Sequence, residues 1–139
     1  MTLLLIVMFA AVAIIGAIIA AVLVLTRGRR GLLNKEEYRM AWLKIENNLD
    51  KNNTATYQFA ILSADKLLDR VLIELDLPGD TMDGRLKDAK DKLSNPSAVR
   101  AAHKLRNQVA QRTDHKINII GARRALLTYK KALKELGAI

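Results

Sequence analysis

The residues of this sequence with the clearest potential for chemistry are Arg106 and Asn107, which are adjacent in one predicted helix. The helix covers residues 96–111 and follows Asn95, a residue type that caps helix N-termini. Gln111 lies four residues after Asn107, and side chains four apart are neighbours on a helix surface. A guanidinium can contact an anion through two parallel hydrogen bonds. We therefore predict that this guanidinium and the adjacent carboxamide are presented to an anionic ligand.

The sequence contains few residues that could form other kinds of catalytic site. The sequence has no cysteine and two histidines, so thiolate metal sites and disulfides are excluded. Its seven glycines are scattered, and no phosphate-binding loop or nucleophile motif is present. Asp65 and Asp69 lie four residues apart, but Lys66 and Arg70 alternate with them, which favours solvated ion pairs. We expect no metal and no cofactor.

A long apolar segment stands at the N-terminus. Residues 3–25 contain no charged or polar side chain, and about 20 apolar residues suffice to cross a bilayer as a helix. A cleaved signal peptide has a basic region first and a shorter apolar core, neither of which is present here. We therefore predict that residues 1–26 are a retained transmembrane anchor.

Basic residues follow this segment at once. Arg27, Arg29 and Arg30 lie in residues 27–34, which we predict to be a juxtamembrane linker that contacts lipid head groups. Basic residues near the end of a span stay on the cytoplasmic side. The prediction is a single-pass protein of the plasma membrane, with its N-terminus outside and residues 35–139 in the cytoplasm.

The rest of the chain has helical periodicity, and no segment alternates as a strand does. The predicted helices cover about residues 35–48, 55–76, 82–93, 96–111 and 118–136. The only tryptophan, Trp42, lies on an apolar stripe and is expected in the core. Apolar residues are sparse in 82–93, which predicts a peripheral helix or a helical loop. The fold class is all-α, an antiparallel bundle of four to five helices preceded by one transmembrane helix.

Positive charge is concentrated in the last third of the chain. The formal net charge is +9, and residues 96–139 contain ten Lys or Arg but only two acidic residues. This asymmetry favours a polyanion, either nucleic acid or an anionic membrane surface. A merely solvated basic face is the alternative. The candidate nucleic-acid-binding residues are Arg106, Asn107, Arg112, Arg123, Arg124, Lys130 and Lys131.

From about Tyr38 to Ile139 the chain resembles the HEPN superfamily of small helical bundles, and within it uncharacterised bacterial proteins with an N-terminal membrane anchor. The resemblance rests on residues 65–69 (Asp-Lys-Leu-Leu-Asp), 84–90 and 102–111, together with the tail 125–136. In that superfamily a late helix carries Arg, usually Asn, three further residues and then His. Here Arg106 and Asn107 match this motif.

The resemblance implies metal-independent RNA cleavage in active members, by two protomers whose motif helices face each other. Arg106 would hold the scissile phosphate and Asn107 would position the pair, so a homodimer through helix 96–111 is expected. Gln111 occupies the position of the His, and an amide cannot exchange protons near neutral pH. His103 and His115 do not replace it by spacing. Because acid–base catalysis contributes on the order of 10²–10⁴-fold, at most feeble cleavage is expected.

Three functions remain open at this stage. The favoured one is a membrane-anchored module that binds RNA or a nucleotide without efficient catalysis. The second is a metal-independent endoribonuclease. In the third, the Arg-Asn pair is structural and the chain is an interaction module that assembles at the membrane.

Overall fold

The computed structural model describes residues 1–29, 33–111 and 117–139, and the side chains of 24–29 lie outside that description. By its contacts the chain divides into two compact units, Met1–Leu32 and Leu33–Ile139. The first contains helix α1 (Thr2–Arg29). Within α1, Thr2–Leu23 is long and apolar enough to cross a membrane, and none of it is buried. The side chains predicted to contact lipid, Arg27, Arg29 and Arg30, fall outside the described part.

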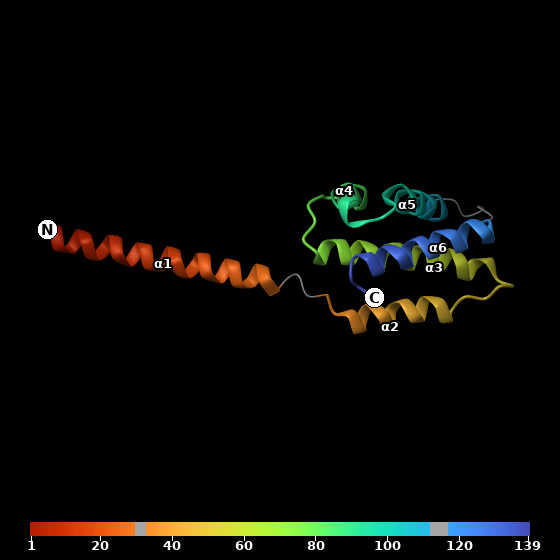
Figure 1. Ribbon diagram of the computed structural model, residues 1–139, viewed down its shortest axis with the longest axis horizontal. Helices are drawn as coiled ribbons and strands as arrows, with labels where there is room; N and C mark the ends of the chain where they lie inside the picture. The colour runs from red at the N-terminus through yellow and green to blue at the C-terminus, as the bar shows by residue number, and fades with distance from the viewer. Residues whose placement is uncertain (30–32, 112–116) are drawn as a thin grey trace. The chain divides into compact units, whose positions relative to one another are not determined.

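The second unit is entirely helical in its described residues (Figure 1). Its elements are α2 (Lys35–Asn47), α3 (Thr54–Glu74), α4 (Met82–Asp88), the 3-10 helix η1 (Lys90–Lys92), α5 (Pro96–Gln111) and α6 (Ile119–Glu135). The all-α prediction is confirmed. The helix expected over 82–93 is shorter, because the chain tightens into η1 after Ala89.

Side-chain caps explain where these helices begin. An Asn or Thr side chain accepts a hydrogen bond from a backbone N–H of the first turn at every α-helix of this unit, and those N–H groups have no partner within the helix. The capping residues are Asn34, Asn53, Thr81, Asn95 and Asn118.

Two helices end through a residue in the left-handed region. Gly137 follows α6 with φ +76°, and the next amide, that of Ala138, donates to Leu133 O at 2.9 Å. Asp76 follows α3 with φ +58°, and the amide of Leu77 donates to Leu72 O at 3.2 Å. Both geometries satisfy carbonyls at the helix end, but only the first uses glycine, the residue that adopts this φ at least cost.

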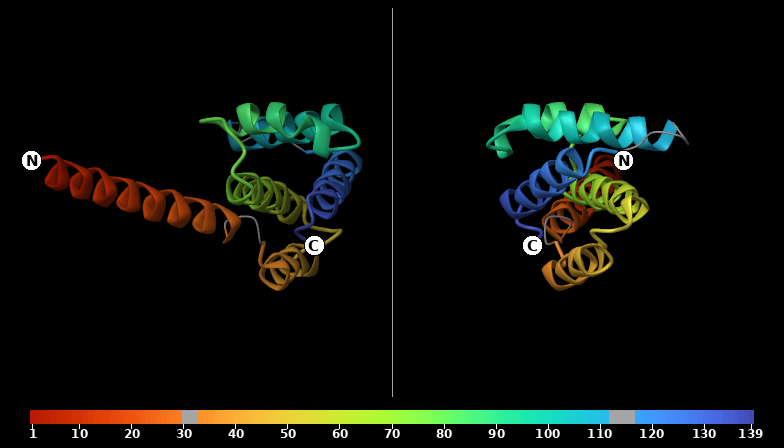
Figure 2. Two further views of the ribbon diagram at one scale, coloured as in Figure 1. Left: turned by 60° about the vertical axis from the view of Figure 1, so that its left-hand side comes forward. Right: turned by 90° about the vertical axis from the view of Figure 1, so that its right-hand side faces the viewer.

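Helix α3 is the centre of the second unit. It packs against α2, α4, α5 and α6, while α5 also packs against α4 and α6. Figures 1 and 2 show α3 and α6 side by side, with α4 and α5 covering one side of this pair and α2 the other. The largest fully buried side chains include Tyr38, Leu68, Tyr129 and Leu133. Trp42 is buried as predicted.

Residues 82–93, expected as a peripheral helix or a helical loop, form the short α4 followed by η1. Met82, Leu86, Ala89 and Leu93 are all buried, so the few apolar residues of this segment all face the core. Their burial follows from the packing of α4 against both α3 and α5. A short helix needs few apolar positions to do this, which explains the sparse apolar pattern.

Candidate functional site

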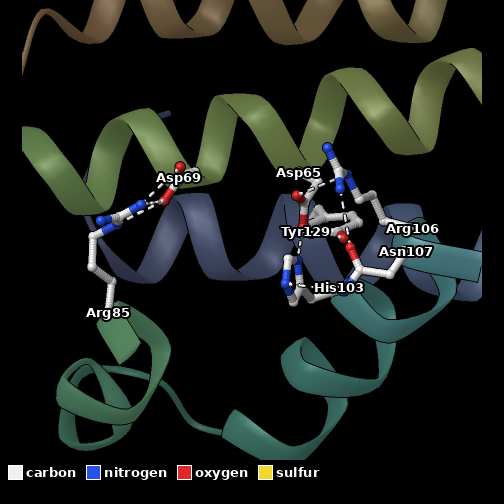
Figure 3. Close-up of polar contacts among 7 residues, drawn as sticks. All are labelled: Asp65, Asp69, Arg85, His103, Arg106, Asn107 and Tyr129. Carbon is white, nitrogen blue, oxygen red and sulfur yellow. Dashed lines mark hydrogen bonds and ion pairs between the residues drawn. The ribbon is translucent and has the colours of Figure 1, made fainter. Parts of the chain in front are cut away.

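A buried carboxylate, Asp65, lies at the middle of α3 where α5 and α6 meet it. Its side chain is 6% exposed, and Oδ1 accepts a hydrogen bond from the Tyr129 hydroxyl at 2.8 Å. The same oxygen lies 2.7 Å from Nδ1 of His103. Figure 3 shows the three side chains converging from three helices. Burying a charged carboxylate costs free energy unless it is paired or hydrogen-bonded, so the fold depends on the partners that surround Asp65.

Arg106 joins the cluster from α5. Its Nε lies 3.4 Å from Asp65 Oδ2, within ion-pair distance, but makes no hydrogen bond. Its Nη1 donates to Asn107 Oδ1 at 3.0 Å. The side chain nevertheless remains 38% exposed. Arg106 therefore has two internal contacts, from Nε to Asp65 and from Nη1 to Asn107 (Figure 3), although part of its side chain is accessible to solvent.

Asn107 links Arg106 to His103. Its carbonyl oxygen accepts from Arg106, and its Nδ2 lies 3.5 Å from Nε2 of His103. The two histidine nitrogens therefore face different partners, Asp65 at Nδ1 and Asn107 at Nε2. A carboxylate at Nδ1 orients an imidazole for proton transfer at Nε2. Here the His103 side chain is only 10% exposed, so the imidazole is enclosed rather than offered to a substrate.

Tyr129 is the buried hydroxyl of the cluster. Burial is the main cause that raises its pKa far above the ordinary value, and the nearby Asp65 carboxylate adds to the effect. The phenol therefore stays protonated and remains a hydrogen-bond donor. This neutral donor stabilises the carboxylate without adding a further charge to the interior.

The expectation of solvated ion pairs at Asp65 and Asp69 was wrong. Asp65 is buried among the three helices, and Asp69 is held by Arg85 of α4. Arg85 Nε donates to Asp69 Oδ1 at 2.8 Å and Nη1 donates to Gly79 O at 2.7 Å. Neither carboxylate pairs with its sequence neighbours, because side chains one residue apart point in different directions on a helix.

No family model, curated protein or solved structure matches this chain. The cluster is therefore interpreted from its geometry. Over the described ranges, no group of three or more His, Asp or Glu side chains is placed to hold a metal ion. The chemistry that the cluster does offer is one accessible guanidinium fixed by a carboxylate and a carboxamide.

The other candidate binding residues are spread over α5 and α6. Gln111 is the exposed last residue of α5, and Arg112 and His115 fall outside the described residues. Arg124 is exposed on α6. The guanidinium of Arg123 lies over the Tyr57 ring, 5.9 Å from its centroid.

Two of the candidate lysines already have acidic partners. Lys130 Nζ lies 2.5 Å from Glu46 Oε1 of α2, and Lys131 Nζ lies 3.9 Å from Glu135. Lys130 is the largest cause that lowers the pKa of Glu46 below its ordinary value. Lys130 is therefore less available to an external anion, whereas the Lys131 side chain is 65% exposed and its contact with Glu135 is long.

The sequence predicted Arg106 and Asn107 but missed Asp65, His103 and Tyr129 as their partners. A signal for Asp65 was present. It lies four residues after Ile61 and three before Leu68, so it occupies an apolar stripe where a charged residue needs buried partners.

Proposed function

We propose that the chain is a membrane-anchored HEPN-like module that binds RNA or a nucleotide and does not cleave efficiently. The supporting observation is the state of Arg106, whose guanidinium contacts Asp65 and Asn107 while its side chain as a whole remains 38% exposed. A guanidinium fixed in this way loses little side-chain freedom when it binds a phosphate.

We propose that catalysis is inefficient because, among the residues that the structure describes, none near Arg106 is placed to exchange a proton with a substrate. Gln111 stands where the superfamily motif has its His, and it cannot act as an acid or base. His103 is close to Asn107, but the ring is buried between Asp65 and Asn107. An endoribonuclease would need one of these positions to present an exposed imidazole to the ribose.

The anchor defines the proposed location. With α1 crossing the plasma membrane and basic residues Arg27, Arg29 and Arg30 on the cytoplasmic side, residues 33–139 would lie in the cytoplasm. Pairing of two copies through α5 would place two Arg106 side chains along one RNA. A protease-protection assay on membrane vesicles tests the orientation.

Salt-dependent RNA retention by the full chain in nonionic detergent tests the ligand. Arg106→Gln and Arg124→Gln are each expected to lower affinity and to reduce the salt slope by about 1 per lost phosphate contact. Lys130→Gln is the matched control, since that cation is already paired with Glu46. Equal retention by the Arg106 variant and the unmodified chain would refute the proposed site.

The same protein tests the catalytic alternative. Labelled RNA incubated with the unmodified chain is expected to remain intact, with or without EDTA. Gln111→His restores the motif residue at an exposed position. Cleavage gained by this variant and lost again on Arg106→Gln would show an inactivated nuclease site, whereas efficient cleavage by the unmodified chain would contradict the proposal.

A structural module at the membrane is the second candidate, and the pairing of Lys130 and Lys131 favours it. In that candidate, Glu46 and Glu135 hold these two lysines for the stability of the bundle rather than for an external anion. In this case Arg106→Gln would lower stability without changing RNA retention. Measuring both properties on one preparation separates the two candidates.

A further inference from the structure

Residues of α2 and α3, with Asn48 and Asn53 between them, line an open groove. Figure 2 shows α2 on the side of α3 away from α4 and α5. The volume of the groove is about 650 Å³. Apolar side chains form much of it, including Ala41 and Ile45 of α2 and Ala60 and Leu67 of α3. Phe59 also lines the groove and is 75% exposed. A contiguous exposed apolar surface rimmed by polar residues commonly marks a binding site.

Basic side chains line the same groove. Lys44, Lys66 and Arg70 are among its lining residues, which include no acidic side chain. Arg70 is neutralised by Glu37 and Glu74. Within the described ranges, no ion pair involves Lys44 or Lys66, and both side chains are exposed. The groove therefore combines an apolar surface with two uncompensated ammonium groups.

We propose that this groove binds an anionic phospholipid, with an acyl chain against Phe59 and the headgroup phosphate at Lys44 and Lys66. Apolar contact and attraction to anionic headgroups together determine binding at a membrane surface. An acidic amphipathic helix would also suit apolar and basic residues. The lipid is favoured because the groove belongs to a chain with a membrane anchor.

The length of the connection supports this choice. Only residues 30–34 separate the last residue of α1 from the first residue of α2. Five residues reach at most about 18 Å when fully extended. A short tether raises the effective concentration of whatever the anchored surface binds. The inference rests on the proposed membrane span but not on RNA binding.

The test places a fluorescent reporter in the groove of the full chain. The variant Trp42→Phe removes the only native indole, and Phe59→Trp adds one at the groove. The protein is reconstituted in nanodiscs of phosphatidylcholine with phosphatidylglycerol, and one lipid at a time carries a spin label on its acyl chain. We expect stronger quenching when the phosphatidylglycerol is labelled.

Matched controls separate a built site from general proximity to lipid. Leu127→Trp in the same background places an indole on α6, at a residue that is 68% exposed. Replacing Lys44 or Lys66 by Ser is expected to weaken the preference for phosphatidylglycerol about fivefold each. If the groove reporter is quenched no more than the α6 reporter, or equally by both lipids, the proposal is overturned.

Two further measurements cover the remaining outcomes. Hydrogen exchange of residues 35–70 in the unmodified chain is expected to slow when phosphatidylglycerol is added, which does not depend on replacing Trp42. Cross-linking from the groove to a second copy, without lipid quenching, would assign the groove to dimerisation and overturn the proposal. No RNA is present in these experiments, so failure of RNA binding and failure of lipid binding remain distinguishable.

Discussion

The hydroxyl of Tyr129 donates to Oδ1 of Asp65 across 2.8 Å and so joins α6 to α3. The same oxygen lies 2.7 Å from His103 Nδ1, which brings α5 to the same point. A buried carboxylate with several partners fixes the register of the helices that supply them, because sliding any helix leaves a charge unpaired. The orientation of Arg106 thus depends on a residue in the core.

Asp65→Ala is predicted to destabilise the second unit by about 3–5 kcal/mol, because it leaves several buried partners without their acceptor. Tyr129→Phe removes one donor and is predicted to cost about 1–2 kcal/mol. Urea unfolding of the full chain in detergent, followed by Trp42 fluorescence, measures both. The single tryptophan is buried in this unit and so reports its unfolding alone.

Asp69→Ala is the matched control for this experiment. Asp69 lies one helical turn from Asp65, but its side chain is 28% exposed and pairs with Arg85 alone among the charged residues described. The loss of stability is predicted to be the smaller one, because Asp69 is partly exposed and Arg85 keeps its hydrogen bond to Gly79 O. Similar losses for the two variants would show that Asp65 is not the centre of the network.

Alkaline pH is predicted to weaken the fold through Tyr129. Burial raises the phenol pKa in the folded state, so its contribution is complete below the ordinary value of 10.0 and is lost as pH rises beyond it. Tyr38 has its pKa raised mainly by burial as well. Tyrosinate absorption is therefore expected to increase together with unfolding. Tyr129→Phe should reduce the dependence of stability on pH above about pH 10.

A titration that ionises Tyr129 of the unmodified chain while Trp42 fluorescence stays native would contradict this prediction. Tyr38→Phe should likewise reduce the alkaline loss of stability, because burial raises the pKa of Tyr38 as well.

Helix boundaries were predictable because their signals are local. Asn34, Asn95 and Asn118 each cap the helix that the apolar pattern predicted after them. The cluster around Asp65 was not predictable in the same way. Its members are up to 64 residues apart in sequence, and helical spacing cannot show which helices pack together.

The charged residues show the same limit. A count of Lys and Arg identified a basic last third but could not show that Lys130 contacts Glu46, a residue 84 positions away. Arg106 was predicted as a site because it is polar beside an apolar face. Its partial exposure depends on Asp65 and Asn107, which only the packed structure reveals.

The ends of α3 and α6 give a matched pair of backbone predictions. Asp76 adopts φ +58°, so Asp76→Gly is predicted to stabilise the second unit by about 0.5–1 kcal/mol. Gly137 adopts φ +76°, and a Cβ there would meet no atom within 4 Å, so Gly137→Ala costs only backbone strain, about 1 kcal/mol. Opposite shifts of the Trp42 unfolding midpoint are expected, and shifts in the same direction would contradict this assignment of the helix ends.

Acid is predicted to weaken the contact between α2 and α6. The hydrogen bond from Lys130 is the main cause that lowers the pKa of Glu46 below its ordinary value of 4.5. A carboxyl group with a lowered folded-state pKa stabilises the protein above its unfolded-state pKa, and this contribution disappears as pH falls through the folded-state value. Because Glu46 and Lys130 are about one third exposed, the effect should stay within about 1 kcal/mol. Glu46→Gln should remove this acid dependence. Lys130→Gln should remove most of it, because Trp42 and Lys134 also lower the pKa of Glu46. The double variant should remove no more than Glu46→Gln alone. Additive effects would mean that the two residues act separately, in which case Lys130 would be available to bind RNA.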